Sequence, residues 1–532
     1  MNESPQVPLD PPSSILDPQP SPDSSLDSRS AILHPRSSAG SALTSGAIST
    51  WRLVIALALP VLAQQSLSFV VMQSDQYLAG HLRPMEVGVS PGSFQVLSGS
   101  LPAALMGMKQ VALQTAATTG RYLAWVIVCY TILVSVGSTA LVARFIGARD
   151  RPLATRVTHQ ALLLAVALGL LGSILALAGG IDWLVETLQL QGEAADLAKR
   201  YLQPLFWLLI FQMMEAAGIA CLVGAGDTRT GMWVMLGVAL VNLPLAWGFA
   251  QGWWPLPRLG FVGIALGTAL SHLLAALVVL FVLARGRFGL RLHIRLFAPN
   301  WNLLKRLLRV GVPAGLDSMS VVAGQLWFLS IVNGLGDVAA GAHGIALGWE
   351  ALGYLSGAAF GTAAMTLVGQ NLGAGKPGRA SHGGWVAFAL GCAVMSFMGA
   401  VFYLLADPMF RFFCPYESQG NVIREGIPVL RLVAFAMPSL ASSIIFTQAL
   451  RGAGDTRVPL LFTWIGFFAV RIPLAYFLAL DEVSLPWFGM DSLPGCGLGL
   501  YGAWLAMVAD LVVRGIFFLV RFARGNWQRI KV

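Results

Sequence analysis

Five carboxylic acids lie inside the long apolar stretches of this 532-residue chain. They are Asp75, Glu215, Asp317, Glu350 and Asp510. A charged side chain in a membrane-spanning helix costs about 2.5–3.5 kcal/mol on insertion scales, so such acids are functional candidates by default. A carboxylate in a partly dry site can take up a proton and release it when the site opens to water.

Each acid also has a structural interpretation. Asp75 would be inert if it lay in water at the outer end of its helix, and Asp317 and Glu350 could be buried acids bonded to backbone or hydroxyl groups. Glu215 follows two methionines, which are more typical of packing than of a ligand surface. Both interpretations stay open for these four residues.

Asp510 has candidate partners in the sequence. Arg514 is one helical turn away, so an i,i+4 ion pair would explain the acid, and Arg471 is a second possible partner. We interpret the intraspan histidines His272 and His343 as structural.

The apolar stretches that carry these residues identify the class of protein. The chain is 56% hydrophobic and 11% charged, whereas soluble proteins contain about 25% charged residues. Stretches of about 20 apolar residues, enough to cross a hydrocarbon core as a helix, recur from Leu53 almost to the C-terminus. We therefore predict an all-α polytopic membrane protein. Its five cysteines are scattered and predict neither a disulfide framework nor a metal site.

An internal repeat organises the chain. The hexapeptide Gly-Ala-Gly-Asp-Thr-Arg occurs at 224–229 and again at 452–457, and a Leu-Val-x-x-x-x-Gly-Ala turn at 141–148 recurs at 367–374. Six spans separate the copies, so equivalent loops lie on the same side of the membrane. This predicts twelve helices in two six-helix bundles related by a pseudo-two-fold axis along the membrane normal, the parallel-repeat arrangement of some transporters.

The acids do not follow the repeat. In the order given above, the equivalent positions of the other half are all neutral: Phe328, Ser443, Gln64, Ala124 and Ser271. The shared scaffold therefore does not require the charges.

The expected boundaries follow from composition. We predict a disordered tail, two six-helix lobes, a basic linker between them and a basic C-terminal tail, at residues 1–48, 49–284, 285–306, 307–525 and 526–532. Most Lys and Arg residues fall in loops on one side, which predicts cytoplasmic termini and an inner, multi-pass cell-membrane location. We expect residues 80–120, with three prolines, to form an outer loop with room for a surface helix, before a span at 121–146. We also expect a single span at 201–223.

Several motifs together resemble the multidrug and toxic compound extrusion family over about residues 51 to 525. They are the two hexapeptides, the two turns, and the segments 75–80 (Asp-Gln-Tyr-Leu-Ala-Gly), 342–345 (Ala-His-Gly-Ile) and 471–476 (Arg-Ile-Pro-Leu-Ala-Tyr). The resemblance implies export of amphipathic, often cationic, compounds in exchange for H+ or Na+.

The resemblance also implies a coupling site in the first half. Asp75 matches the family's first-helix carboxylate, and Asn242 and Thr268 match neighbouring polar positions. Ionised, Asp75 could hold Na+ with Asn242 and Thr268 as neutral oxygen donors. Some members carry further acids where this chain has Ala246, Val321 and neutral residues at 439–443.

Glu215, Asp317, Glu350 and Asp510 remain candidates for substrate binding or coupling. No GxxxxGK[ST] loop, HExxH or GxSxG motif occurs, so we expect an ion gradient rather than ATP to drive transport, with no enzyme activity and no cofactor. The basic residues serve topology rather than nucleic-acid binding. We expect a monomer in the lipid bilayer that carries a small-molecule substrate. The alternative is a lipid-linked oligosaccharide flippase, for which Arg471 and Arg514 are a hint.

Overall fold

The computed structural model describes residues 44, 48–81, 103–187, 192–414, 416, 419–485 and 490–530, and helices dominate this part of the chain. The first half contains eight α-helices and one π-helical turn: α3 (Thr50–His81), α4 (Ala103–Gly147), α5 (Arg151–Leu175), η2 (Ala176–Gly180), α6 (Ile181–Thr187), α7 (Gly192–Trp207), α8 (Leu209–Ala225), α9 (Thr228–Gln251) and α10 (Phe261–Ala284). A short 3-10 helix, η3 (Ile294–Phe297), lies in the connection to the second half.

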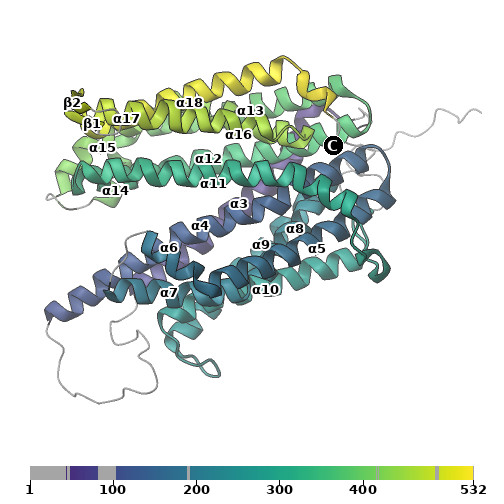
Figure 1. Cartoon of the computed structure of the whole chain (residues 1–532), viewed down its shortest axis with the longest axis horizontal. Helices are drawn as coiled ribbons and strands as arrows, with labels where there is room; N and C mark the ends of the chain where they lie inside the picture. Colours follow the sequence, from purple (N-terminus) through teal and green to yellow (C-terminus); the bar gives the residue numbers. More distant parts are fainter. Residues whose placement is uncertain are drawn as a thin grey trace, which may run out of the picture.

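The second half repeats this layout with a small hairpin added. Its elements are α11 (Trp301–Gly334), α12 (Asp337–Gly373), α13 (Pro377–Leu404), α14 (Ala406–Phe413), α15 (Gly420–Ala453), α16 (Arg457–Trp464), η5 (Ile465–Arg471), α17 (Ile472–Ala479), β1 (Glu482–Leu485), β2 (Met490–Pro494), α18 (Gly499–Ala523) and η7 (Asn526–Arg529). Strands β1 and β2 pair antiparallel. Figure 1 shows the two halves as two bundles inclined to each other.

The described chain has the helices that twelve membrane crossings need. Eleven helical segments are long and apolar enough to span a bilayer, and α7 with α8 forms a bent pair that makes a twelfth. The predicted all-α, twelve-helix architecture is confirmed.

Two sequence expectations about the first half were wrong in detail. Helix α4 already begins at Ala103, so the C-terminal part of the expected outer loop is a helix continuous with the following span. Three prolines bias residues 80–120 towards a loop, but all of them precede residue 103, and the stretch after it is rich in Ala, Leu, Met and Gln, which favour helix. Residues 82–102 lie outside the described part.

The expected single span at 201–223 is broken. Helices α7 and α8 meet at Leu208 with a bend of 54°. Pro204 lies one turn before the break, where it removes a backbone donor from the helix.

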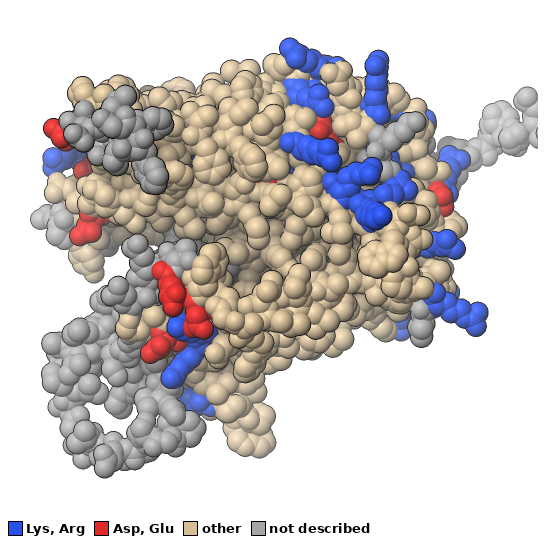
Figure 2. All heavy atoms as spheres, in the orientation of Figure 1, with Lys and Arg blue, Asp and Glu red and all other residues tan. Residues whose placement is uncertain are grey.

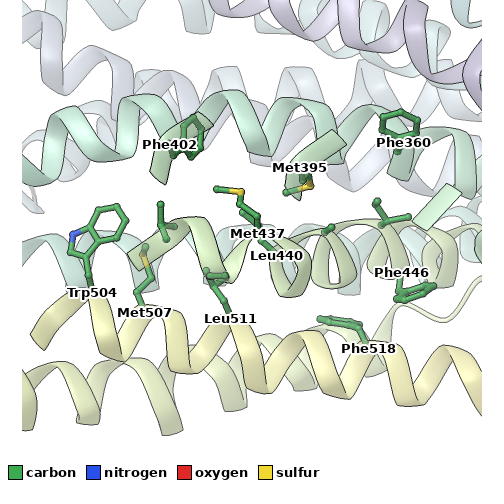
Figure 3. Packing of buried hydrophobic residues seen from close by; sticks show 14 of the residues in the cluster. Phe360, Met395, Phe402, Met437, Leu440, Phe446, Trp504, Met507, Leu511 and Phe518 are labelled. Atoms are coloured by element: carbon green, nitrogen blue, oxygen red, sulfur yellow. The ribbon is translucent and has the colours of Figure 1, made fainter. Parts of the chain in front are cut away.

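The second bundle is held together by a large apolar core. Figure 3 shows Met395 and Phe402 of α13, Met437 and Phe446 of α15, and Trp504, Met507, Leu511 and Phe518 of α18 interleaved along the bundle. All of them are buried. A separate cluster forms the core of the first bundle.

The first helix of each half starts against the opposite half. Leu53, Val54 and Leu57 of α3 belong to the core of the second bundle. Conversely, Leu303 and Leu307 of α11 belong to the core of the first bundle. The two bundles are thus joined by reciprocal packing of their first helices.

The two ends of the molecule differ. Figure 2 shows Lys and Arg side chains gathered at the end where α10 and α18 finish and α11 begins, which we call the basic end. At the opposite end the surface is hollowed between the two bundles, and we call this hollow the cleft.

Candidate functional site

Three polar side chains of the first bundle meet inside the membrane-spanning region. The Thr268 hydroxyl of α10 donates to Asp75 Oδ2 of α3 at 2.6 Å, and Asn242 Nδ2 of α9 donates to Thr268 Oγ1 at 2.8 Å. Asp75 is 9% exposed and Asn242 is fully buried. The structure therefore brings together all three residues predicted for the coupling site.

Glycines of α10 allow this meeting. At Gly267, an added Cβ would lie against the backbone of Ala246, and at Gly263 it would lie against the backbone of Phe249. Helices α9 and α10 can approach this closely only without side chains there. Asn242 and Thr268 sit beside this contact, which places them within hydrogen-bond distance.

The network leaves two buried acceptors without a donor. Asp75 Oδ1 and Asn242 Oδ1 have no hydrogen-bond partner in the described part of the chain. Buried polar atoms are normally paired because desolvation without a hydrogen bond costs free energy. A proton on the carboxylate, or a hard cation that prefers oxygen ligands, would relieve this deficit.

A second polar pair lies one helical turn from Thr268. His272 Nδ1 is 2.7 Å from Glu215 Oε2 of α8, and the side chains are 17% and 7% exposed. Thr268, which donates to Asp75, therefore lies on α10 between the coupling site and this pair. We interpreted His272 from the sequence as structural alone. Its i,i+4 spacing from Thr268, which puts both on one face of α10, is the sequence signal that could have placed it near Asp75.

An apolar layer lies against the site. Leu78, Leu197 and Ile264 form a small cluster with which Tyr201 of α7 packs, and the Tyr201 ring stacks on Phe261 with ring centres 4.9 Å apart. Helix α7 is bent away from the axis of α8. Its residues Leu197 and Tyr201 therefore belong to this apolar layer on a half-helix separate from α8.

In the second bundle, Asp510 is neutralised by two arginines. Arg514 donates to both carboxylate oxygens at 2.6 Å, and Arg471 Nη2 lies 2.7 Å from Oδ2. Arg471 also donates to Gln325 Oε1 at 3.2 Å. Both partners named from the sequence bind the acid at once, so the group is an ion cluster that tolerates burial because its charges are paired.

The remaining two acids occupy different surroundings. Asp317 of α11 binds Arg451 of α15 at 2.7 Å, and both residues are buried. In the described part of the chain, no hydrogen bond or ion pair reaches Glu350 of α12, whose side chain is half-buried. Asp317 and Glu350 do not come together with Asp75.

The two halves carry opposite polarity at equivalent positions. Asn242 of the first half corresponds to Arg471, and Asp75 corresponds to Phe328. The Arg471 guanidinium lies 5.6 Å from the centre of the Phe328 ring. Where the first half holds an acid and an amide, the second half holds a cation over an aromatic ring, so only the first half is suited to bind a cation there.

A cavity of about 330 Å³ lies elsewhere, between α9 and α10. Its lining is largely apolar and includes the exposed side chains of Trp233, Leu274 and Val278. The coupling-site residues Asp75, Asn242 and Thr268 are not part of it. We interpret it as a groove on the outer surface of the bundle.

Comparison with known proteins identifies relatives of this chain. A family model described as MatE matches residues 93–247 and 313–477. The chain is 28% identical over 439 residues to a probable multidrug resistance protein NorM of Thermotoga maritima, covering 82% of this chain and 90% of the relative. It is 30% identical over 309 residues to the multidrug resistance protein NorM of Burkholderia vietnamiensis, covering 57% and 63%.

Solved structures share the fold. A MOP superfamily transporter from Pyrococcus furiosus gives a TM-score of 0.76 at 21% identity, covering 93% of this chain and 99% of that one. An outward-facing multidrug resistance transporter of the MATE family also gives 0.76, at 20% identity, with 92% and 99% covered.

Proposed function

The chain belongs to the MatE family of multidrug and toxic compound extrusion transporters, and on this premise we propose that it exports amphipathic, cationic small molecules in exchange for H+ or Na+. Members of this family are membrane transport proteins rather than enzymes. The proposed mechanism is alternating access, in which the two bundles rock so that the cleft opens first to one side of the membrane and then to the other.

One observation carries the coupling proposal. Asp75 Oδ1 and Asn242 Oδ1 are buried acceptors with no donor in the described part of the chain, while Thr268 holds the other carboxylate oxygen. A bound proton or Na+ neutralises Asp75 and supplies the missing partner. Loss of the ion leaves a buried charge, which favours the conformation that opens the site to water.

A pair of side chains on α12 offers a matching feature for a cationic substrate. Glu350 and Tyr354 are one helical turn apart on α12, and the Tyr354 side chain is 55% exposed. A carboxylate beside an aromatic ring suits an amphipathic cation through charge and cation–π attraction.

The decisive experiment uses the purified full chain in proteoliposomes with ethidium as the transported probe. A pH gradient and a Na+ gradient are imposed separately, and a protonophore is added to the first. We expect one of the gradients to drive ethidium transport. Asp75→Asn should abolish this transport and leave expression intact, because the amide cannot carry the coupling charge.

The matched control is Asp407→Asn, which removes an exposed acid of α14 outside the spans. We expect it to transport ethidium as the unaltered chain does. Gradient-driven transport by Asp75→Asn at the unaltered rate would refute the coupling assignment.

The alternative of a lipid-linked oligosaccharide flippase finds little support in the geometry. It requires open basic side chains to hold a pyrophosphate, but Arg471 and Arg514 are 2% and 8% exposed and both bind Asp510. Binding of undecaprenyl pyrophosphate, without ethidium transport, would favour that function.

We further propose that the basic end faces the cytoplasm of the cell (inner) membrane, because Lys and Arg are enriched in cytoplasmic loops. The helices α3 and α11 then begin, and α10 and α18 end, on the cytoplasmic side. One chain supplies both bundles, with lobes at 49–284 and 307–525, and so can act as a monomer.

A further inference from the structure

The two copies of the hexapeptide end their helices in the same way. In the first copy, Gly226 adopts φ 97° and Asp227 N donates to Leu222 O at 2.8 Å; in the second, Gly454 adopts φ 86° and Asp455 N donates to Leu450 O at 2.9 Å. This left-handed ending satisfies two of the last carbonyls of each helix. The carbonyls that follow have no partner within the helix.

Side chains from the opposite half bind those free carbonyls. Gln370 of α12 donates through Nε2 to Gly224 O at 2.9 Å. Arg144 of α4 donates through Nη2 to Ala453 O at 3.1 Å. Gln370 and Arg144 are themselves repeat equivalents, since 370 − 144 = 226 is also the offset between the two Leu-Val turns.

The same two turns form the crossing of α4 and α12. A Cβ added to Gly147 would collide with the backbone of Gln370, and one added to Gly373 would collide with the backbone of Arg144. Gly147 and Gly373 are also separated by 226 residues. The crossing is therefore reciprocal, as expected if the pseudo-two-fold axis passes through it, and it needs glycine on both sides.

Each hexapeptide loop is fastened to its own bundle. Asp227 binds Arg287 at 2.6 Å, just beyond the end of α10. Asp455 binds Arg521 at 2.7 Å, near the end of α18. Asp227 also accepts from Thr230 N and caps α9, whereas α16 begins after Thr456 without a side-chain cap. The carbonyls thus move with their own half.

We propose that the repeated hexapeptides provide the hydrogen-bond acceptors of a gate at the basic end. Gln370 and Arg144 each donate to the loop of the other half, and both bonds must break for the cleft to open at that end. This inference rests on the proposed alternating-access function. Thr366 Oγ1 adds a bond to Val223 O at 3.2 Å on the Gln370 side. The guanidinium bond is charge-assisted and lies at the negative end of a helix dipole, so it is the stronger of the two.

The test measures the distance between the halves directly. Ala284 and Ala523 are exposed repeat equivalents at the ends of α10 and α18. The five native cysteines are removed, and Ala284 and Ala523 are both replaced by cysteine. The two new cysteines are spin-labelled, and the full chain is reconstituted in lipid. Pulsed electron paramagnetic resonance then gives the populations with the basic end closed and open.

Gln370→Met keeps the size of the side chain and removes the donor. We expect the ratio of open to closed populations to rise roughly three- to tenfold, and Arg144→Met to raise it roughly ten- to a hundredfold. Thr366→Val, a nearly isosteric change, should shift the ratio in the same direction by less. Arg144→Lys, which keeps a charged donor, should restore most of the closed population.

The control is Asn371→Leu. Asn371 is an equally buried amide next to Gln370, but it donates to Leu367 O of its own helix at 2.9 Å, so we expect no shift. Unchanged distances in both Gln370→Met and Thr366→Val, with unchanged unfolding temperature, would overturn the gate. Because no ion or substrate gradient enters this measurement, its failure is separate from failure of Asp75 to couple transport.

Discussion

Replacing either of two buried acids by Asn should change the free energy of unfolding by very different amounts. Asp510 is fully buried and accepts from Arg471 and from Arg514, which are themselves buried. Replacement by Asn leaves two guanidinium groups without their counter-ion. Removing one partner of a buried ion pair costs about 3–5 kcal/mol, so we expect Asp510→Asn to lower the free energy of unfolding by at least about 3 kcal/mol.

Asp75 presents the reverse case. It has no bonded cation in the described part of the chain, and one of its oxygens lacks any donor. Asp75→Asn removes a buried charge without breaking an ion pair, so we expect the unfolding free energy to change by no more than about 1 kcal/mol. This variant should lose coupling while it keeps its fold.

The assay is thermal unfolding of the purified variants in detergent. At roughly 2–4 °C per kcal/mol for units of this size, Asp510→Asn should unfold at least about 6 °C below the unaltered chain, and Asp75→Asn within a few degrees of it. A triple variant that installs the equivalent first-half residues, Arg471→Asn, Asp510→Ser and Arg514→Ala, should recover much of the loss because it removes all three charges.

The comparison has a clear point of failure. If Asp510→Asn unfolded at the temperature of the unaltered chain, the Arg471–Asp510–Arg514 cluster would not contribute to the stability of the second bundle. If Asp75→Asn lost as much stability as Asp510→Asn, Asp75 would be a structural acid and the argument from its free oxygen would be wrong.

Three further predictions concern the same site and its surroundings. Thr268→Val, which removes the hydroxyl bonded to Asp75, should weaken the apparent affinity for the coupling ion about tenfold in the ethidium assay. Gly267→Leu should push α10 away from Ala246 and abolish coupling without loss of expression, measured by transport and membrane abundance. The Arg411 guanidinium, hydrogen-bonded at 2.7 Å, holds the pKa of Asp407 below its ordinary value. That contribution to stability is present above the ordinary range of an aspartate and is lost only as pH falls below it. The transport–pH profile between about pH 5 and 8 should therefore be the same in Asp407→Asn and in the unaltered chain.

The sequence predicted the repeat and the number of spans because each leaves a local signal, whereas the group around Asp75 was implied by the resemblance to the family. The two hexapeptides are identical in sequence, and Asp75 begins one of the segments that carry the resemblance. The start of α4 was missed because prolines before residue 103 obscured the helix formers after it. The break at Leu208 was missed because Pro204 can be accommodated in many apolar helices.

The ion partners were harder to foresee. Asp317 and Arg451 are 134 residues apart, and only the tertiary fold brings them together. The hexapeptide sequences also do not reveal their free carbonyls, because these are a property of a helix end in three dimensions and not of any side chain.

The reciprocal start of the first helices bears on how such a chain could arise. Val54 and its neighbours complete the core of the second bundle, and Leu307 and its neighbours complete that of the first. Two identical six-helix subunits that exchanged these segments would form a domain-swapped homodimer with two-fold symmetry. Joining them head to tail through a basic connection yields the present topology. Either half expressed alone would then lack the opposite bundle, against which the start of its first helix packs.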